Sequence, residues 1–369
     1  MKKLLFGAYS LDIGGIEKAL VILLNKLQEK GYDITLVLEK RQGIFLNEIN
    51  PKIKIIEYAP SNSKNKIQRK IINLIKRIKF TLKNKNKYDF SASFATYSLP
   101  ASFVARTASK NCYLWGHADY LTLFDGNTEK MKEFFIERNY DKFKKIIFVS
   151  KEGKESFIKV FPEMKEKTMI CNNLIDADKI LELSKEKIPE EDLLKINKLE
   201  NTQKETTTFI NVGRHQEKQK KLSRLIEVAT MLKKDNMNFK IIFIGDGPET
   251  EEYKKQVRNN QLENNIIFLG KKQNPYPYFK IADCVVLTSD YEGYPVVFLE
   301  SFILEKPIIT TKVSDYQEVE NKYGFVTEKD TKDIYEKMKN FILNGFEIKE
   351  KFDYKKYNEE ILKKIEDLI

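Results

Sequence analysis

Residues 290–300 read Asp-Tyr-Glu-Gly-Tyr-Pro-Val-Val-Phe-Leu-Glu and follow an apolar run, residues 284–288, that is typical of a buried strand. Pro295 suits the first turn of a helix, where a missing N–H loses no hydrogen bond. The stretch therefore predicts a strand, a tight loop and a helix entrance in succession. Backbone N–H groups point outward at such an entrance and the helix dipole favours an anion, so the loop suits a phosphate or a hydroxyl-rich ligand.

Two glutamates stand eight positions apart in this stretch, Glu292 in the loop and Glu300 on the predicted helix. Ionised carboxylates only accept hydrogen bonds, so such a pair can hold two parts of one polyhydroxylated ligand. The plain alternative is a helix-capping glutamate followed by a solvent-exposed one. The two residues alone leave both interpretations open.

Short β-rich runs alternate with helical patterns along the chain, which predicts parallel sheets wrapped by helices. Residues 1–175 are predicted to form one Rossmann-like domain, residues 176–207 a polar interdomain connection, and residues 208–353 a second Rossmann-like domain. Residues 354–369 predict a last amphipathic helix that packs back on the first domain. Two such domains leave a cleft between the carboxyl ends of their sheets, where proteins of this type bind ligands.

The amino-acid composition and the length of the apolar runs argue against a disordered chain and against a membrane-spanning helix. The 369 residues are 41% hydrophobic and 32% charged, with 24 Phe and 18 Tyr, which excludes a disordered chain. No stretch approaches the ~18–20 continuous apolar residues of a membrane-spanning helix. The apolar run after Lys3 is interrupted at Asp12, too early for a secretory signal, so we expect a cytoplasmic protein.

Cysteine and histidine are scarce. Cys112, Cys171 and Cys284 are far apart and odd in number, so they predict neither a disulfide framework nor a zinc site and are interpreted as small buried hydrophobic residues. His117 and His215 are the chain's two histidines, too few for a histidine-based metal site. We therefore expect no bound metal.

The net charge of +11 comes almost entirely from one segment. Residues 64–87 hold ten Lys and Arg and no acid, and their apolar residues fall on one helical face: Ile67, Ile71, Leu74, Ile75, Ile78 and Leu82. The plain interpretation is a helix that docks this face on its own sheet. The alternative is an anionic membrane surface, which attracts about 1 kcal/mol per nearby basic residue. No nucleic-acid-binding motif is present, so nucleic acid is not expected as a partner.

The Glu-x7-Glu pattern, with Glu-Gly-x-Pro at its start and a strand before it, resembles that of glycosyltransferase family 4. The resemblance implies an α/β protein of the GT-B fold, with two Rossmann-like domains facing across a cleft, and a retaining nucleotide-sugar transferase. It covers most of the chain. Four further motifs support it in chain order: Gly14-Gly15, Gly213-Arg214, Gly-Asp-Gly-Pro at residues 245–248, and Tyr-Phe-Lys-Ile-Ala-Asp at residues 278–283.

The resemblance implies a donor site in the second domain. Arg214 and Lys220 would neutralise the leaving diphosphate, Glu292 would hold the sugar, and Glu300 would accept hydrogen bonds from the ribose hydroxyls. Cations on a loop at a strand end can stabilise the charge that grows on a diphosphate. The backbone at the helix entrance would complete the sugar site, through Gly293, Tyr294, Pro295 and Val296.

Which lysine serves the diphosphate is left open by the loop length, because this loop is one residue longer than the family pattern. Counting back from Leu225 selects Lys220, whereas counting forward from Arg214 reaches Gln219. We predict Lys220, with Lys218 and Lys221 as alternatives.

In the first domain, the resemblance places Gly14 and Gly15 on the floor of the cleft, next to the sugar and the pyrophosphate. His117 would contact the transferred sugar. Asp119 is predicted either to bind the acceptor or to hold its loop. His215 is assigned no role.

The resemblance, with these residues, implies a retaining hexosyltransferase. It would move a hexose-type sugar from a nucleotide diphosphate sugar, with a UDP-sugar preferred, to a growing, lipid-linked surface glycan in capsule, lipopolysaccharide or other polysaccharide biosynthesis. No cofactor is implied, and residues 64–87 would hold the enzyme at the inner face of the cell membrane. The alternatives are a catalytically silent sugar-nucleotide-binding partner and a membrane-surface scaffold.

Overall fold

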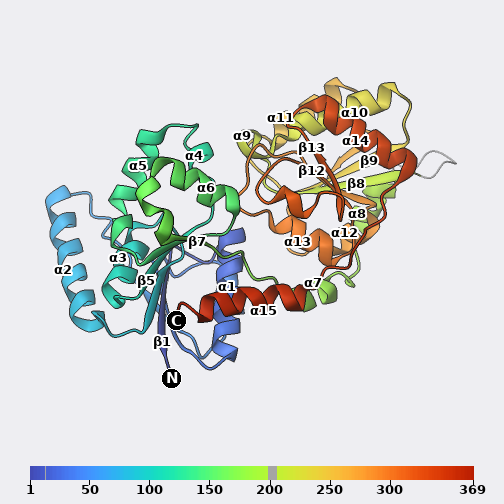
Figure 1. Cartoon of the computed structure of the whole chain (residues 1–369). Helices are drawn as coiled ribbons and strands as arrows, with labels where there is room; N and C mark the ends of the chain where they lie inside the picture. Colours follow the sequence, from blue (N-terminus) through green and yellow to red (C-terminus); the bar gives the residue numbers. More distant parts are fainter. Residues whose placement is uncertain (13, 198–205) are drawn as a thin grey trace. The chain divides into compact units, whose positions relative to one another are not determined.

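The computed structural model describes residues 1–12, 14–197 and 206–369, which fold as two compact units (Figure 1). Unit 1 comprises Met1–Ile175 and Lys355–Ile369, and unit 2 comprises Asp176–Tyr354. Each unit holds one all-parallel sheet with helices between successive strands. The prediction of two Rossmann-like α/β domains is confirmed.

Unit 1 contains a seven-stranded sheet with the order β3-β2-β1-β4-β5-β6-β7. Its strands are β1 (Lys3–Ala8), β2 (Asp33–Leu38), β3 (Lys54–Glu57), β4 (Phe90–Ser93), β5 (Cys112–Gly116), β6 (Lys145–Phe148) and β7 (Thr168–Ile170). Its helices are α1 (Gly15–Glu29), η1 (Ile44–Glu48), α2 (Lys66–Asn84), α3 (Leu99–Ala108), α4 (Tyr120–Leu123), α5 (Thr128–Glu137), η2 (Tyr140–Lys142), α6 (Lys151–Val160), η3 (Pro162–Lys167) and α15 (Tyr354–Glu366). The strand order reverses between β1 and β4, the kind of position where open α/β sheets bind ligands.

Unit 2 contains a six-stranded sheet with the order β10-β9-β8-β11-β12-β13. Its strands are β8 (Thr207–Val212), β9 (Phe239–Ile244), β10 (Ile266–Phe268), β11 (Cys284–Leu287), β12 (Ile308–Thr311) and β13 (Gly324–Thr327). Its helices are α7 (Ala177–Leu183), α8 (Glu190–Asn197), α9 (Glu217–Lys220), α10 (Leu222–Lys234), α11 (Thr250–Asn259), α12 (Tyr276–Ile281), α13 (Val296–Ile303), η4 (Tyr316–Glu318) and α14 (Thr331–Asn344). Here the reversal lies between β8 and β11, and the loops after these two strands build the site described below.

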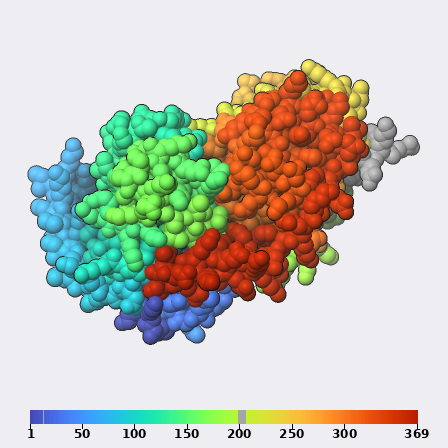
Figure 2. Space-filling view, in the orientation of Figure 1, coloured from blue at the N-terminus to red at the C-terminus, as the bar shows by residue number. Residues whose placement is uncertain are grey.

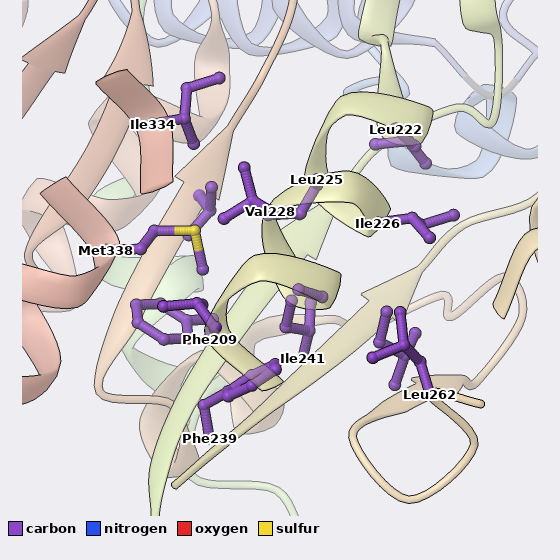
Figure 3. Close-up of a cluster of buried hydrophobic side chains, with 14 of the residues drawn as sticks. Phe209, Leu222, Leu225, Ile226, Val228, Phe239, Ile241, Leu262, Ile334 and Met338 are labelled. Atoms are coloured by element: carbon purple, nitrogen blue, oxygen red, sulfur yellow. The ribbon is translucent and has the colours of Figure 1, made fainter. Parts of the chain in front are cut away.

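The core of unit 2 lies between its sheet and helices α10 and α14 (Figure 3). Leu222, Leu225 and Ile226 of α10 recur at helical spacing and are fully buried, as are Phe209 and Met338 on the facing elements. Burying one such side chain stabilises the fold by roughly 1.5–3 kcal/mol. This packing fixes where α10 begins and therefore where the loop before it ends.

Residues 176–197, predicted as part of the connection, form α7 and α8 and belong to unit 2. The buried Asp192 carboxylate accepts hydrogen bonds from Lys272 Nζ and Tyr278 Oη, both at 2.5 Å, and so attaches α8 to unit 2. Residues 198–205 of the predicted connection lie outside the described residues. Helix α15 packs on unit 1, where the Asn358 side chain bonds the backbone N–H and carbonyl of Ile175 at 3.0 and 2.8 Å.

Helix α2 leaves its apolar face uncovered. The apolar residues at helical spacing are 46–78% exposed, and only Phe80 and Asn84 of this helix are buried. Figure 2 shows the light-blue α2 at the surface of unit 1. The plain interpretation, that this face docks on the sheet, is wrong, because α2 packs through Phe80 and the opposite side of the helix. Among the described residues, no helix is both long enough and apolar enough to span a membrane.

Candidate functional site

Glu292 lies in the loop between β11 and α13, where three side chains bind its carboxylate. Oε1 accepts from Lys220 Nζ at 2.6 Å and from Ser289 Oγ at 2.7 Å, and Oε2 accepts from Gln219 Nε2 at 3.2 Å. The Glu292 side chain is 8% exposed and that of Lys220 is 16% exposed. A carboxylate has about four acceptor positions, so the three donors fix its orientation and leave one position for a ligand.

Hydrogen bonds join the loop after β8 to the loop after β11. Thr288, at the end of β11, donates its hydroxyl to the carbonyls of Lys220 and Lys221 at 3.0 and 3.1 Å. The Asp290 N–H donates to the Gln219 carbonyl at 2.8 Å. Lys221 has a left-handed backbone, φ 51°, which turns the chain from α9 into α10. The loop after β8 therefore brings Lys220 and Gln219 to the loop after β11.

Residues 214–224 hold five cations, the exposed Lys218 and four others whose surroundings differ. Lys220 pairs with Glu292, whereas Lys221 lies 3.7 Å from Asp290. Arg224 donates to the same Asp290 carboxylate at 2.9 Å, so it holds the loop in place. Arg214 is exposed and pairs with no acid among the described residues. The predicted Lys220 is thus the lysine that the structure brings to Glu292.

Helix α13 begins at Val296, and Pro295 is its N-cap, directly before the first turn in which it was predicted. Glu300 lies in the second turn, half-buried, and accepts a hydrogen bond from Tyr276 Oη at 2.9 Å. The Glu292 carbonyl accepts from Ser314 Oγ at 2.7 Å. Both predicted glutamates are therefore held by side chains of unit 2, Glu292 by a cation and two neutral donors and Glu300 by a neutral donor, and neither is a simple solvent-exposed side chain.

His117 follows β5 in unit 1, with its ring centroid 4.6 Å from that of Phe94. Its Nε2 is buried and has no hydrogen-bond partner among the described residues. Burial lowers the pKa of His117 to about 3, so the imidazole is neutral near pH 7. An unpaired buried polar atom is costly unless something bonds it, so Nε2 of His117 lacks the hydrogen bond that a buried ring nitrogen normally makes.

Gly14 and Gly15 form the entrance of α1, with Gly14 as its N-cap in extended conformation. A Cβ at Gly15 would meet nothing within 4 Å, and one at Gly14 would meet only the flexible end of Glu17. The protein's own packing therefore does not demand glycine at either position. Close approach of a ligand to this backbone remains a prediction.

Asp119 is the N-cap of α4. Its Oδ1 accepts from the N–H groups of Leu121 and Thr122 at 3.1 and 3.2 Å, and its Oδ2 accepts from the Thr122 hydroxyl at 2.6 Å. The carboxylate thus holds its loop, the second of its two predicted roles. Acceptor binding by Asp119 stays a prediction.

Gln219 and Ser289 are site residues that sequence reasoning did not select. Ser289 stands three positions before Glu292, a spacing that allows a local hydrogen bond, and Gln219 was reached only by counting forward from Arg214. Among the described residues, no three His, Cys, Asp or Glu side chains converge as metal ligands.

His215 is fully buried, with Nδ1 2.8 Å from the Thr250 hydroxyl and its ring edge-on to Phe243, Tyr253 and Phe268. Burial lowers the pKa of this imidazole as well. A Cβ at Gly247 would lie 2.0 Å from the His215 carbonyl, so the loop after β9 needs glycine to pack against the loop after β8. His215 and Gly247 therefore shape the site's backbone.

Residues 194–359 match the family model described as Glycosyl transferases group 1. An uncharacterized glycosyltransferase of Methanocaldococcus jannaschii is 31% identical over 166 residues, which are 45% of this chain and 39% of that protein. The N-acetylgalactosamine-N,N'-diacetylbacillosaminyl-diphospho-undecaprenol 4-alpha-N-acetylgalactosaminyltransferase of Campylobacter jejuni is 26% identical over 181 residues, which are 49% of this chain and 45% of that protein. The aligned segments span less than half of these relatives. The segment that matches the glycosyltransferase family model includes Glu292 and Lys220.

A solved structure resembles the whole chain. Anabaena HepE, crystallised with UDP and glucose, superimposes with a TM-score of 0.76 at 17% identity, covering 99% of this chain and 100% of that one. At this identity the likeness is one of fold, and the fold is that of GT-B glycosyltransferases.

Proposed function

We propose that this protein is a retaining glycosyltransferase of family 4 that moves a hexose-type sugar from a UDP-sugar to a growing, lipid-linked surface glycan. The observation that carries the proposal is the buried Lys220–Glu292 pair beside the entrance of α13, inside the segment that matches the glycosyltransferase family. Two relatives support the finer points. HepE was crystallised with UDP and glucose, and the Campylobacter enzyme is named for a diphospho-undecaprenol substrate.

On the donor side, Lys220 and Arg214 offset the negative charge that the diphosphate gains as the glycosidic bond breaks. Arg214 pairs with no acid among the described residues, so it breaks no ion pair when it binds the diphosphate. Lys220 keeps its bond to Glu292 and bridges that carboxylate to the phosphate. The open acceptor position of Glu292 takes a sugar hydroxyl, and the α13 entrance favours the nearby anion. Glu300, oriented by Tyr276, accepts from the ribose hydroxyls.

In the transfer step, the bond between the anomeric carbon and the diphosphate oxygen breaks, and the acceptor oxygen bonds the same face of that carbon. The leaving phosphate takes the acceptor's proton, so no protein base is required. The neutral His117 offers Nε2 to a sugar hydroxyl, and Gly14 and Gly15 let backbone approach the pyrophosphate. These roles in unit 1 are part of the proposal.

The exposed face of α2 supports attachment to the inner face of the cell membrane. Six large apolar side chains of this helix are exposed, among ten basic residues and no acid at residues 64–87. An amphipathic helix of this kind lies in the membrane interface, with its apolar face in the acyl boundary and its cations at anionic headgroups.

A transfer assay tests the function. The whole chain is incubated with labelled UDP-, GDP- and ADP-sugars and a short-chain polyprenyl-diphosphate sugar, and label is followed into the organic phase. We expect transfer from one donor, with the donor's anomeric configuration kept in the product. Donor binding without turnover would favour the catalytically silent partner. A product with the inverted anomeric configuration would exclude the retaining mechanism.

Vesicle flotation tests the membrane attachment. We expect binding to anionic vesicles that is lost in an Ile71→Ser/Ile78→Ser variant. An Ile136→Ser variant is the control, because Ile136 is also exposed in unit 1 but stands on α5, outside the basic segment. Equal flotation of all three proteins would contradict a role for α2.

A further inference from the structure

The acceptor position that Glu292 keeps open lies on its Oε2 atom. Oε1 already accepts two hydrogen bonds, from Lys220 Nζ at 2.6 Å and from Ser289 Oγ at 2.7 Å, whereas Oε2 accepts one, from Gln219 Nε2 at 3.2 Å. Each carboxylate oxygen has two acceptor positions. A ligand hydroxyl that bonds Glu292 therefore bonds Oε2, beside the amide of Gln219.

The orientation of the Gln219 amide follows from its two acceptors. Nε2 donates to Glu292 Oε2 and also to the Tyr291 carbonyl, at 3.3 Å. A carboxylate and a carbonyl only accept hydrogen bonds, so the amide nitrogen must face them and the amide oxygen faces away from them. The backbone is fixed as well, because the Gln219 N–H donates to the Gln216 carbonyl at 3.2 Å and its carbonyl accepts from the Asp290 N–H at 2.8 Å.

Oε1 of Gln219 is consequently an acceptor that the protein leaves unused. No described residue donates to it, and it is not a buried atom, since the side chain is partly exposed. It can lie no farther from Glu292 Oε2 than the 3.2 Å contact plus the width of the amide group. Hydroxyls on neighbouring carbons of one sugar ring span such a distance. The two oxygens therefore form a pair of acceptors, one charged and one neutral.

We propose that Gln219 selects the donor sugar: its Oε1 and the open position of Glu292 Oε2 accept hydrogen bonds from two neighbouring hydroxyl or N–H groups of the transferred sugar. The substrate class is a neutral sugar in which both groups are free. A sugar that lacks one of them leaves an acceptor of the site unpaired, which a site built for hydrogen bonds rejects. This inference rests on the proposed function and names the donors that the Glu292 site accepts.

Binding of deoxy analogues tests the pair without any turnover. UDP-glucose, UDP-galactose and UDP-N-acetylglucosamine are titrated into the whole chain by calorimetry, and the tightest binder is compared with analogues that each lack one hydroxyl. In the wild-type protein we expect two analogues, altered at neighbouring positions, to bind about threefold to tenfold more weakly than the parent. A wild-type protein that binds every analogue as tightly as the parent would overturn the proposal.

The variant Gln219→Met assigns one of these losses to the amide, because methionine keeps the length of the side chain but offers no carbonyl oxygen. At least one of the two losses should vanish in this variant, and a variant that keeps both would overturn the proposal. Gln216→Met is the control, on the same short helix, because the Gln216 side chain makes no capping hydrogen bond. It should keep both losses.

UDP alone is the control ligand, since it lacks the sugar. Gln219→Met should bind UDP within about twofold of the wild-type protein while its affinity for the UDP-sugar falls by about threefold to tenfold. An equal fall for UDP and for the UDP-sugar would show that the substitution disturbs the loop as a whole, and would overturn the assignment of Gln219 to the sugar.

A pH dependence tests the amide's hydrogen bond to Glu292. Gln219→Glu keeps the shape of the side chain but sets a second carboxyl beside Oε2, and two carboxyls this close share a proton because the pKa of one is raised. Lys220 favours the charge on Glu292, so the introduced carboxyl holds the proton at low pH and again donates to Oε2. The other charged residues of these two loops are unchanged in the variant: Arg214, Glu217, Lys218, Lys221, Arg224 and Asp290.

The affinity of Gln219→Glu for the UDP-sugar should therefore be about tenfold below that of the wild-type protein at pH 8 and should recover toward pH 5. Gln219→Met should show no such recovery. An equal loss at both pH values in Gln219→Glu would contradict the hydrogen bond and overturn the proposal.

The wild-type titrations separate this inference from the proposed function. If the wild-type chain binds neither UDP nor any of the UDP-sugars, the proposed function fails and this inference fails with it. If the wild-type chain binds a UDP-sugar and Gln219→Met discriminates among the analogues as the wild-type protein does, this inference alone fails.

Discussion

The two units differ in where their charged and polar groups find partners. In unit 2, Glu292 is bonded by Lys220, Gln219 and Ser289 before any ligand arrives. In unit 1, Nε2 of His117 has no partner, and Arg77 meets a ring but no acid, among the residues that the structure describes. The Glu292 site of unit 2 is therefore preorganised by the protein itself, whereas these two groups of unit 1 lack such partners.

Among substitutions in the preorganised Glu292 site, we expect Glu292→Gln to have the largest effect on donor turnover. The amide keeps the size of the side chain but leaves Lys220 without its counter-charge and changes the group that faces the sugar. We expect donor turnover to fall by about 10²–10³-fold, in the range of a lost electrostatic group in an active site. The measurement is the rate of nucleotide release.

The matched control is Glu305→Gln, an exposed carboxylate just beyond the end of α13. It should keep near wild-type turnover. A Glu292→Gln enzyme as active as this control would show that the Glu292 carboxylate is not needed for turnover, which contradicts the proposal.

A smaller effect is expected at Arg214, whose guanidinium pairs with no acid among the described residues. Arg214→Gln should lower kcat/KM for the donor by about tenfold to a hundredfold, since a bond to a charged group contributes roughly 1.5–3 kcal/mol. The free energy of unfolding should change by less than about 0.5 kcal/mol, because the exposed side chain pairs with no acid among the described residues. Lys234→Gln, an exposed cation in the last turn of α10, is the control, and equal kinetic losses in both variants would assign the effect to net charge.

The smallest effect is expected in unit 1, as a pH dependence of stability. The His117 pKa falls from 6.5 to about 3 in the folded protein, so between these values the unfolded chain binds a proton that the folded one does not. This contribution to stability is present above about pH 6.5 and is lost as the pH falls toward 3, at up to about 1.4 kcal/mol per unit.

Urea unfolding at pH 7 and pH 5 measures this dependence. A His117→Gln variant should lose about 1–2 kcal/mol less stability between these two values than the wild-type protein. Identical losses would mean that the imidazole titrates normally and is not buried as a neutral group.

The sequence predicted the two sheets well because parallel strands buried on both faces leave continuous apolar runs, such as β11 before the Glu292 loop. The loop that holds Glu292 could be recognised because a helix entrance after a strand has local signs, whereas Lys220 was selected through the resemblance, by counting back from Leu225. It did not select Gln219, because the contact with Glu292 joins loops 73 positions apart and has no local sign.

The sequence also could not show what covers the apolar face of α2. A helical spacing of apolar residues shows which face is apolar but not what covers it, so Ile67 to Leu82 fit a sheet and a membrane equally well. The exposed fractions decide against the sheet. Likewise Asp119 carries a carboxylate suited to a ligand or to a helix cap, and only the structure shows the cap.

Thermal unfolding in a panel of UDP-, GDP- and ADP-sugars measures whether this chain binds a nucleotide-sugar donor. A ligand at a hundred times its dissociation constant stabilises a protein by about 2.7 kcal/mol. We expect one donor, a UDP-sugar, to raise the unfolding midpoint of the wild-type chain and to be slowly hydrolysed by it. An unchanged midpoint and no hydrolysis across the whole panel would show that the chain binds none of these donors and would contradict the proposed function.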